Sequence, residues 1–215
     1  MLTEEEMIQA VEAAASLGVH KLRITGGEPL VKKNILSICE KSAAVEGIEE
    51  VCVTTNGTLL SQYAKPLKKA GVKRINLSLD TLNPKKYAHI TRLGTLSQAL
   101  DGLHAALDAG FEKIKINAVL IGGFNDDEIV PMAQLTRKYP VDMRFSELMP
   151  IQDHDEFGEA AFIPCKKSSN SFPTPCPKAG TEAWHACTAC REHRAMWESS
   201  ARSATISAPA ATASG

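Results

Sequence analysis

Apolar and polar residues alternate with a period of two in five short segments of the chain, and helical patterns separate these segments. The predicted strands cover residues 21–25, 51–56, 74–80, 113–121 and 141–148. The predicted helices cover residues 4–17, 35–44, 60–70, 85–91, 96–109 and 126–138. Strands that alternate with helices in this way indicate βα units and a parallel sheet.

Two of the predicted helices begin with capping sequences. Thr3 is expected to cap the first helix, with Glu6 three residues later to close a capping box, and Gly18 is expected to end that helix. Asn125 is expected to cap the helix over 126–138, with Glu128 in the same capping-box position.

Each predicted strand has one apolar and one polar face. In the third strand Ile75 and Leu77 alternate with Asn76 and Ser78. A parallel sheet covered by helices on both sides is apolar on both faces. The apolar face must pack against the helices, so we expect the polar face to line an open (βα) TIM-type barrel with a polar ligand at the carboxyl ends of its strands. An antiparallel sheet with one solvated face is the alternative, but the intervening helices argue against it.

The composition changes sharply near residue 160. Ile206 is the only Val, Ile or Leu from Cys165 to the end of the chain, where Ala, Ser, Thr, Pro and Gly predominate. Such a segment cannot bury enough apolar surface to offset the entropy of ordering. We therefore expect a folded α/β domain over 1–160 and a low-complexity, disordered tail over 161–215.

Charge and cysteine content narrow the classes of function. The 24 basic and 25 acidic residues give a net charge of −1, which argues against nucleic-acid binding. No apolar run is long enough to span a membrane, and the acidic start does not resemble a secretory signal. Cys39 and Cys52 are too few and too isolated for a disulfide framework, which favours a reducing compartment, either the cytoplasm or, in a eukaryote, the mitochondrial matrix.

Three short motifs follow predicted strands. They are Thr-Gly-Gly-Glu-Pro at 25–29, Thr-Thr-Asn-Gly at 54–57 and Leu-Ser-Leu-Asp-Thr at 77–81. Glycines leave the backbone open to close contact with a ligand, and Glu28 offers a carboxylate to an amino group. Each motif alone could be simple turn chemistry. Three polar strand ends at one edge of a parallel sheet indicate a ligand site.

Together with Lys-Ile-Asn-Ala-Val at 115–119 and Arg-Phe-Ser-Glu-Leu-Met-Pro at 144–150, these motifs resemble the radical S-adenosylmethionine (radical SAM) superfamily. Within it, the ordered set over about residues 2–150 resembles the molybdenum cofactor biosynthesis protein A family, GTP 3′,8-cyclase. The resemblance implies a barrel of the radical SAM type with about five strands retained. It also implies conversion of GTP to the cyclic pyranopterin precursor of molybdopterin, with S-adenosylmethionine and a [4Fe–4S] cluster as cofactors.

The resemblance also implies site residues, by position in the motifs. Those for S-adenosylmethionine are Gly26, Gly27, Glu28, Ser78 and Met149, and those for GTP are Arg23, Thr54 and Lys115. Arg23 and Lys115 lie on the inward-facing parity and supply the positive charge that a triphosphate needs. The alternative for these two cations is pairing with carboxylates such as that of Asp80.

The sequence departs from the family at both ends. No Cys-x₃-Cys-x₂-Cys motif occurs in it, so no metal ligand is assigned and the chain alone is expected to be inactive. Cys187 and Cys190 with His185 could bind zinc only if a disordered tail supplied convergent geometry. The family's first strand is also missing, so we expect an unprotected sheet edge and self-association.

Two functions of different class remain. The first is an incomplete GTP 3′,8-cyclase, and the second is a non-catalytic fragment that binds S-adenosylmethionine or GTP or associates with a full-length partner. A radical SAM enzyme that modifies peptides is a third alternative.

Overall fold

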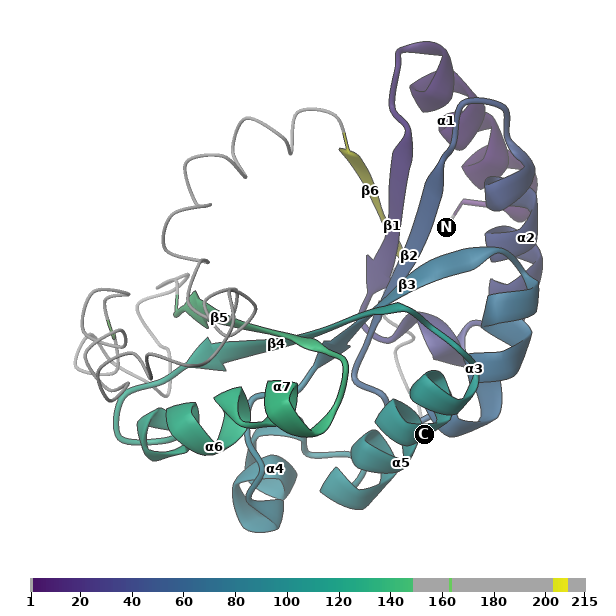
Figure 1. The fold of residues 1–215 in the computed structure, drawn as a ribbon. Helices are drawn as coiled ribbons and strands as arrows, with labels where there is room; N and C mark the ends of the chain where they lie inside the picture. The colour runs from purple at the N-terminus through teal and green to yellow at the C-terminus, as the bar shows by residue number, and fades with distance from the viewer. Residues whose placement is uncertain (1, 149–162, 164–202, 209–215) are drawn as a thin grey trace, which may run out of the picture. The chain divides into compact units, whose positions relative to one another are not determined.

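A computed structural model describes residues 2–148, 163 and 203–208, which form two compact units (Figure 1). Among these residues, the first unit comprises 2–77, 97–114 and 203–208, and the second comprises the remaining described residues.

The first unit is a parallel sheet with helices along one face. Strands β1 (Lys21–Gly26), β2 (Glu50–Thr55) and β3 (Val72–Ser78) lie side by side, and a further strand, β6 (Ser203–Ala208), pairs with the other edge of β1. The helices are α1 (Glu4–Ser16), α2 (Ile35–Ala44), α3 (Leu60–Lys69) and α5 (Leu96–Asp108), with a short 3₁₀ turn at Pro29–Val31. Figure 1 shows α1, α2 and α3 along one side of β1, β2 and β3.

The second unit contains the parallel pair β4 (Lys113–Leu120) and β5 (Asp142–Glu147), in a register that sets Lys115 opposite Asp142. Its helices are α4 (Pro84–Thr91), α6 (Ile129–Ala133) and α7 (Leu135–Lys138), with a 3₁₀ turn at Asp126–Glu128. All five predicted strands therefore form, and helices separate them as predicted.

The first helix begins as its sequence predicts. The Thr3 hydroxyl accepts a hydrogen bond from the Glu6 amide at 3.2 Å, and the Glu6 carboxylate accepts one from the Thr3 amide at 2.8 Å. Glu4, in the first turn, accepts hydrogen bonds from Asn34 and Ser37 and pairs with Lys41 of α2 at 2.7 Å. These contacts attach the start of α1 to α2.

The single helix and capping box predicted over 126–138 are wrong. The segment divides into a 3₁₀ turn and the two short helices α6 and α7, and Asn125 makes no capping hydrogen bond. Pro131 lacks the amide that a continuous helix needs. The side chains of Asn125 and Glu128 instead bind the loop after β3, so tertiary hydrogen bonds replace the local cap.

The alternation of the strands produces one packed face and one more accessible face. In β1, Leu22 and Ile24 are buried whereas Arg23 is exposed. In β4, every second residue from Ile114 onward is buried and the residues between them are only half-buried. Strand β2 differs, because Cys52 on its polar parity is also buried.

Residues Ser203–Ala208 correct two expectations. They form β6, which pairs with β1 over the register Lys21–Ser203 to Gly26–Ala208, so this part of the predicted disordered tail is a strand. The edge of β1 that we expected to be unprotected is paired with β6, whereas self-association stays a prediction. The rest of the tail, including Cys187 and Cys190, lies outside the described residues.

Candidate functional site

The loop after β1 is held by the carboxylate of Glu28. Its Oε1 accepts hydrogen bonds from the Leu30 amide at 3.0 Å and from the Thr55 hydroxyl at 2.8 Å, and its Oε2 accepts one from the Asn56 amide at 2.7 Å. Glu28 thereby caps the 3₁₀ turn at Pro29–Val31 and joins the loop after β1 to the loop after β2.

Glu28 accepts three hydrogen bonds from protein donors and makes no ion pair with any residue that the structure describes. A carboxylate has about four lone-pair positions, so one position remains open to a further donor. The adjoining Gly26 is half-buried and Gly27 is exposed, and neither has a side chain to cover its backbone. This loop can therefore receive a cationic amino group.

The Thr-Thr-Asn-Gly motif forms a tight turn at the end of β2. The Thr55 hydroxyl accepts a hydrogen bond from the Gly57 amide at 3.1 Å, and Asn56 Oδ1 accepts one from the Thr58 amide at 2.9 Å. Gly57 has a φ of +82°, and a Cβ there would lie 2.4 Å from Cδ1 of Leu77. Glycine is thus required both by the turn and by its packing.

Arg23 and Thr54 lie on the polar face of the same sheet. Arg23 is exposed and makes no hydrogen bond or ion pair with the described part of the chain. The Thr54 hydroxyl is half-buried and accepts a hydrogen bond from Asn76 Nδ2 at 3.2 Å. The carboxylate pairing considered for Arg23 therefore does not occur within its unit, and its charge is available to an anion.

A second arginine on this face is occupied. Arg74, opposite Cys52 in the register, forms a salt bridge with Glu50, whose other oxygen lies 3.9 Å from Lys113 Nζ. Glu50 is the first residue of β2, so this cluster lies at the opposite end of the strands from the three motifs. It neutralises Arg74 and has a structural role.

In the second unit the loop after β3 is held by hydrogen bonds from β4 and the segment that follows it. Asp80 Oδ1 accepts a hydrogen bond from the Val119 amide at 2.8 Å. Burial raises the pKa of the Asp80 carboxyl, and the Val119 hydrogen bond opposes that shift. Asn125 donates to the carbonyls of Asp80 and Val119 and accepts from the Ile121 amide.

Glu128 is bound in the same manner as Glu28. Its Oε1 accepts from the Thr81 hydroxyl at 2.7 Å and its Oε2 from the Leu82 amide at 2.6 Å. Unlike Glu28, it also has a cationic partner, since Lys86 Nζ lies 3.1 Å from Oε1. Lys86 in turn pairs with Asp127.

The predicted site residues divide between the two units. The first unit holds Arg23, Gly26, Gly27, Glu28 and Thr54, and it brings Glu28 against the loop that follows Thr54. In the second unit Ser78 is exposed and Lys115 is half-buried, while Met149 lies outside the described residues.

The described residues do not fit a [4Fe–4S] cluster. Their two cysteines, Cys39 and Cys52, are buried, and within the described ranges no three His, Cys, Asp or Glu side chains gather as a metal site. Iron–sulfur clusters require a convergent set of cysteine thiolates, which two isolated cysteines do not provide.

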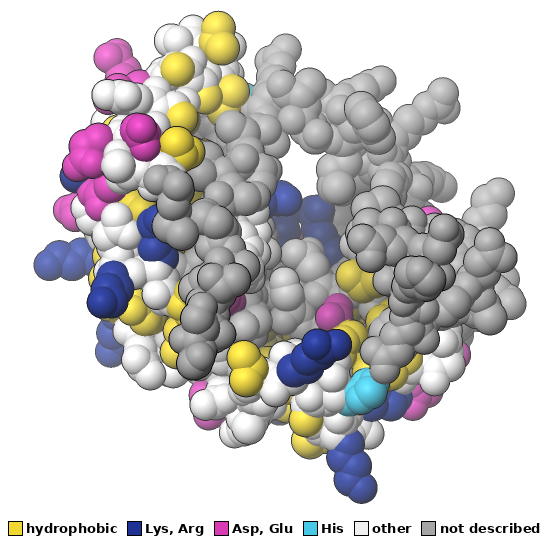
Figure 2. Space-filling model, turned by 180° about the vertical axis from the view of Figure 1, so that it is seen from behind, with side chains coloured by type: hydrophobic (Ala, Val, Ile, Leu, Met, Phe, Trp, Pro, Cys, Tyr) yellow, Lys and Arg dark blue, Asp and Glu magenta, His cyan; other side chains and the backbone are white. Residues whose placement is uncertain are grey.

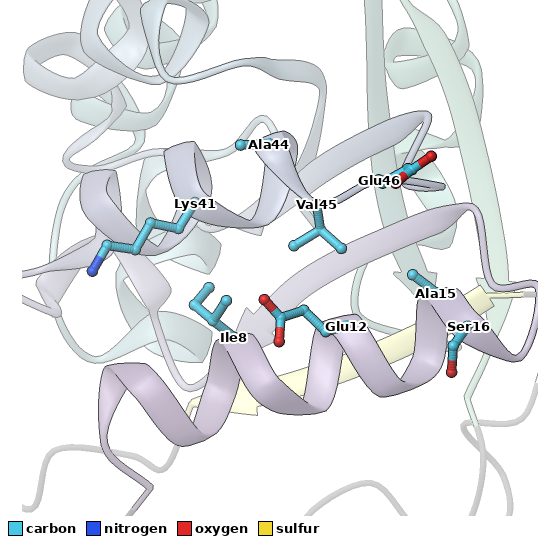
Figure 3. A pocket seen from close by; sticks show the side chains of 8 residues that line it. All are labelled: Ile8, Glu12, Ala15, Ser16, Lys41, Ala44, Val45 and Glu46. Carbon is cyan, nitrogen blue, oxygen red and sulfur yellow. The ribbon is translucent and has the colours of Figure 1, made fainter.

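A groove of about 680 Å³ lies on the outer side of the first unit, between α1 and α2 (Figure 3). The residues that line it include the apolar Ile8, Ala44 and Val45 and the acidic Glu12 and Glu46. Figure 2 shows acidic side chains gathered over these helices, at the upper left of that view. None of the predicted site residues lines this groove, so it is separate from the candidate site.

Sequence reasoning missed Thr55, Asn125 and Glu128 as residues that organise the site. The sequence contained one signal for Thr55, because Thr55 lies on the same face of β2 as Val51 and Val53. A polar residue on an apolar parity needs a buried partner. The residue types of Asn125 and Glu128 predicted a helix cap, so their hydrogen bonds to the loop after β3 were not predicted.

Among the described residues, no helix is long and apolar enough to cross a membrane.

Several solved structures share the fold. The chain matches a maturase of the [FeFe]-hydrogenase, HydG, with a TM-score of 0.57 and 18% identity over 78% of this chain and 40% of that one. It matches a radical SAM methyltransferase from Sphaerobacter thermophilus with a TM-score of 0.57 and 16% identity over 96% and 58% of the two chains. The fold is accordingly the partial (βα) TIM-type barrel expected from the sequence.

Curated relatives are much more similar in sequence. The chain is 45% identical over 177 residues to a GTP 3′,8-cyclase from Alkaliphilus oremlandii, covering 82% of this chain and 55% of the relative. It is 51% identical over 152 residues to a GTP 3′,8-cyclase from Peptoclostridium acidaminophilum, covering 71% and 47% respectively. The chain thus spans about half the length of these relatives. The model of the radical SAM superfamily matches residues 1–136, more than half of the chain, which therefore belongs to the radical SAM superfamily.

Proposed function

We propose that the chain carries the S-adenosylmethionine- and GTP-binding part of a GTP 3′,8-cyclase, the activity named for its relatives. The substrate-binding residues in this proposal are Arg23, Thr54 and Lys115, and those for S-adenosylmethionine are Gly26, Gly27, Glu28, Ser78 and Met149. The cytoplasm is the proposed location. The net charge of −1 argues against a nucleic-acid partner.

The observation that carries the proposal is the contrast between Glu28 and Glu128. Both carboxylates accept a threonine hydroxyl and the next backbone amide, but only Glu128 has a lysine beside it among the described residues. The ammonium group of S-adenosylmethionine would supply the missing cation at Glu28. A hydrogen bond to a charged group contributes about 1.5 to 3 kcal/mol, or roughly 10- to 100-fold in affinity.

Arg23 supports the GTP part of the proposal. Its guanidinium is exposed, has no partner among the described residues and lies on the polar face of β1. A planar guanidinium binds phosphate oxygens in a bidentate manner. A surface arginine with only a structural role would not need such a ligand.

Calorimetric titration of the 215-residue chain with GTP tests the substrate. Arg23→Ala is expected to weaken GTP binding at least about 10-fold, because one charged hydrogen-bonding partner is lost. Lys21→Ala is the matched control, since Lys21 is an exposed cation on the same face of β1 two residues earlier. Equal losses from the two variants would indicate a diffuse charge effect and contradict a GTP site at Arg23.

Titration with S-adenosylmethionine tests the cofactor in the same way. Glu28→Gln keeps most of the shape of the side chain and removes its charge, so a loss of about 10-fold or more is expected. Unchanged affinity in this variant would remove Glu28 from the site. Failure of the unaltered chain to bind either ligand would overturn the proposed function.

A second candidate function is based on the lack of a cluster-binding cysteine motif in the sequence. The sequence contains no Cys-x₃-Cys-x₂-Cys motif, and the described residues provide no ligand set for an iron–sulfur cluster. A non-catalytic protein that binds the same two ligands, or that associates with a full-length enzyme, is the alternative. Iron and sulfide analysis after anaerobic reconstitution separates the two functions, because cluster assembly with formation of 5′-deoxyadenosine would exclude the non-catalytic one.

A further inference from the structure

Two buried threonines bind distant carboxylates with the same geometry. In the first unit, the Thr55 hydroxyl donates to Oε1 of Glu28 at 2.8 Å while the amide of the next residue, Asn56, donates to Oε2 at 2.7 Å. In the second unit, the Thr81 hydroxyl donates to Oε1 of Glu128 at 2.7 Å while the next amide, that of Leu82, donates to Oε2 at 2.6 Å.

Each threonine hydroxyl is also an acceptor in its own turn. Thr55 Oγ1 accepts from the amide of Gly57 at 3.1 Å, and Thr81 Oγ1 accepts from the amide of Asn83 at 3.0 Å. Each threonine therefore links a turn at or shortly after the end of a strand to a carboxylate far away in the sequence. Thr55 and Thr81 are 2% and 0% exposed, so solvent cannot replace these bonds easily.

The carboxylates come from different places in the chain, which excludes a purely local turn motif as the origin of the geometry. Glu28 precedes its threonine by 27 residues, from the loop after β1, whereas Glu128 follows its threonine by 47 residues, from the 3₁₀ turn after β4. In both cases the carboxylate joins two loops at the carboxyl ends of strands. The proposed ligand residue Gly27 lies in the loop after β1, and Ser78 is the last residue of β3, directly before the loop that contains Thr81.

We propose that Thr55 with Glu28 in the first unit, and Thr81 with Glu128 in the second, are positioning pairs for the proposed S-adenosylmethionine residues. Each pair holds the strand-end loop of its own unit in the conformation in which Gly27 or Ser78, respectively, binds that ligand. The inference rests on the proposed function for the identity of the ligand. Thr55, Thr81 and Glu128 act on the ligand through the loops, whereas Glu28 both positions a loop and offers its remaining lone pair. The affinity of a ligand falls in proportion to the fraction of molecules whose loops are in the competent conformation.

Two substitutions of each threonine separate the hydroxyl from the shape of the side chain. Thr55→Val and Thr81→Val keep the branched shape and remove the hydrogen bonds, whereas Thr55→Ser and Thr81→Ser keep the hydroxyl. The control is Thr91→Val in α4, which removes a hydroxyl that donates to the Tyr87 carbonyl at 2.7 Å, away from the strand ends. A purely structural role would lower the stability in all three valine variants without changing the affinity of the folded protein.

The test is calorimetric titration of the full chain with S-adenosylmethionine, well below the melting temperature of every variant. We expect Kd to rise about 10-fold in each of Thr55→Val and Thr81→Val, to return to within about 2-fold of the original value in the serine variants, and to stay unchanged in Thr91→Val. Unchanged Kd in Thr55→Val and Thr81→Val would overturn the inference.

Hydrogen exchange provides a readout that does not depend on the ligand. The amides of Asn56 and Leu82 should exchange faster in the valine variants, and protection should return with serine. If the unaltered chain does not bind S-adenosylmethionine, the proposed function fails, and the exchange measurement then decides only whether the pairs hold the loops. Full protection of both amides in the valine variants would then refute the positioning role.

Discussion

The buried side chain of Asn125 joins three backbone groups of the second unit. Its side chain is 0% exposed, accepts a hydrogen bond from the Ile121 amide at 2.8 Å, and donates to the carbonyls of Asp80 at 2.7 Å and Val119 at 2.8 Å. Asn125→Ala would leave three backbone groups without these partners. An unsatisfied buried group costs about 1 to 3 kcal/mol, and water entering the space would recover part of that.

We therefore expect Asn125→Ala to lower the free energy of unfolding by about 3 to 5 kcal/mol, a large share of the roughly 5 to 15 kcal/mol of a typical domain. Urea unfolding followed by circular dichroism measures this loss. The matched control is Asn83→Ala, which removes an exposed cap that accepts a hydrogen bond from the Lys85 amide at 2.9 Å and should cost about 1 kcal/mol. A loss in Asn125→Ala no larger than that in Asn83→Ala would refute the assignment of Asn125 as a tertiary hydrogen-bonding centre.

Three further predictions concern the first unit. Gly57→Ala should lower the free energy of unfolding in urea by about 2 to 3 kcal/mol, because φ is +82° and the added Cβ would overlap Leu77 of β3. Gly18→Ala, with φ of +87° and open space around the added Cβ, should lower it by about half as much. Equal losses would contradict the packing argument. The hydrogen bond from Lys41 holds the pKa of Glu4 at about 2, below its usual 4.5. The contribution of Glu4 to stability is therefore complete above about pH 4.5 and is lost as the pH falls toward 2. The free energy of unfolding should fall less steeply with acid in Glu4→Gln, and an identical profile would show that the pair contributes nothing. Burial raises the pKa of the Cys39 thiol to about 12. Iodoacetamide at pH 8 should therefore leave Cys39 unmodified in the native protein and modify it in urea, as mass-spectrometric mapping would show. Rapid labelling of the native protein would count against the burial of Cys39.

The regular elements were predictable because their signals are local. The period of two in β1 and β4 and the Thr3–Glu6 capping box depend on residues within a few positions of each other, and the structure contains both. The segment 126–138 was not predictable in this way. Its start resembles a helix cap, but Asn125 and Glu128 form stronger contacts with a loop more than 40 residues earlier.

The same distinction applies to the candidate site. The motifs around Gly27, Thr54 and Ser78 identified the strand ends, because glycines and polar residues at the end of an alternating strand are visible in the sequence. The partners of Glu28 were not visible. A carboxylate in a Gly-Gly-Glu-Pro turn can face a ligand, solvent or another loop, and the choice depends on which backbone amides the folded chain brings to it.

By itself, the sequence determined the five strands of residues 21–148, every helix between them except the one over 126–138, the alternation of apolar and polar strand faces, and the membership of the radical SAM superfamily. Hydrophobic periodicity and turn chemistry carry that information within short windows of the chain. The tertiary structure alone decided that Glu28 and Glu128 bind threonines at strand ends, that Arg74 is neutralised by Glu50, and that residues Ser203–Ala208 pair with β1. These contacts join residues far apart in sequence, and buried donors and acceptors select their partners only after the strands have come together.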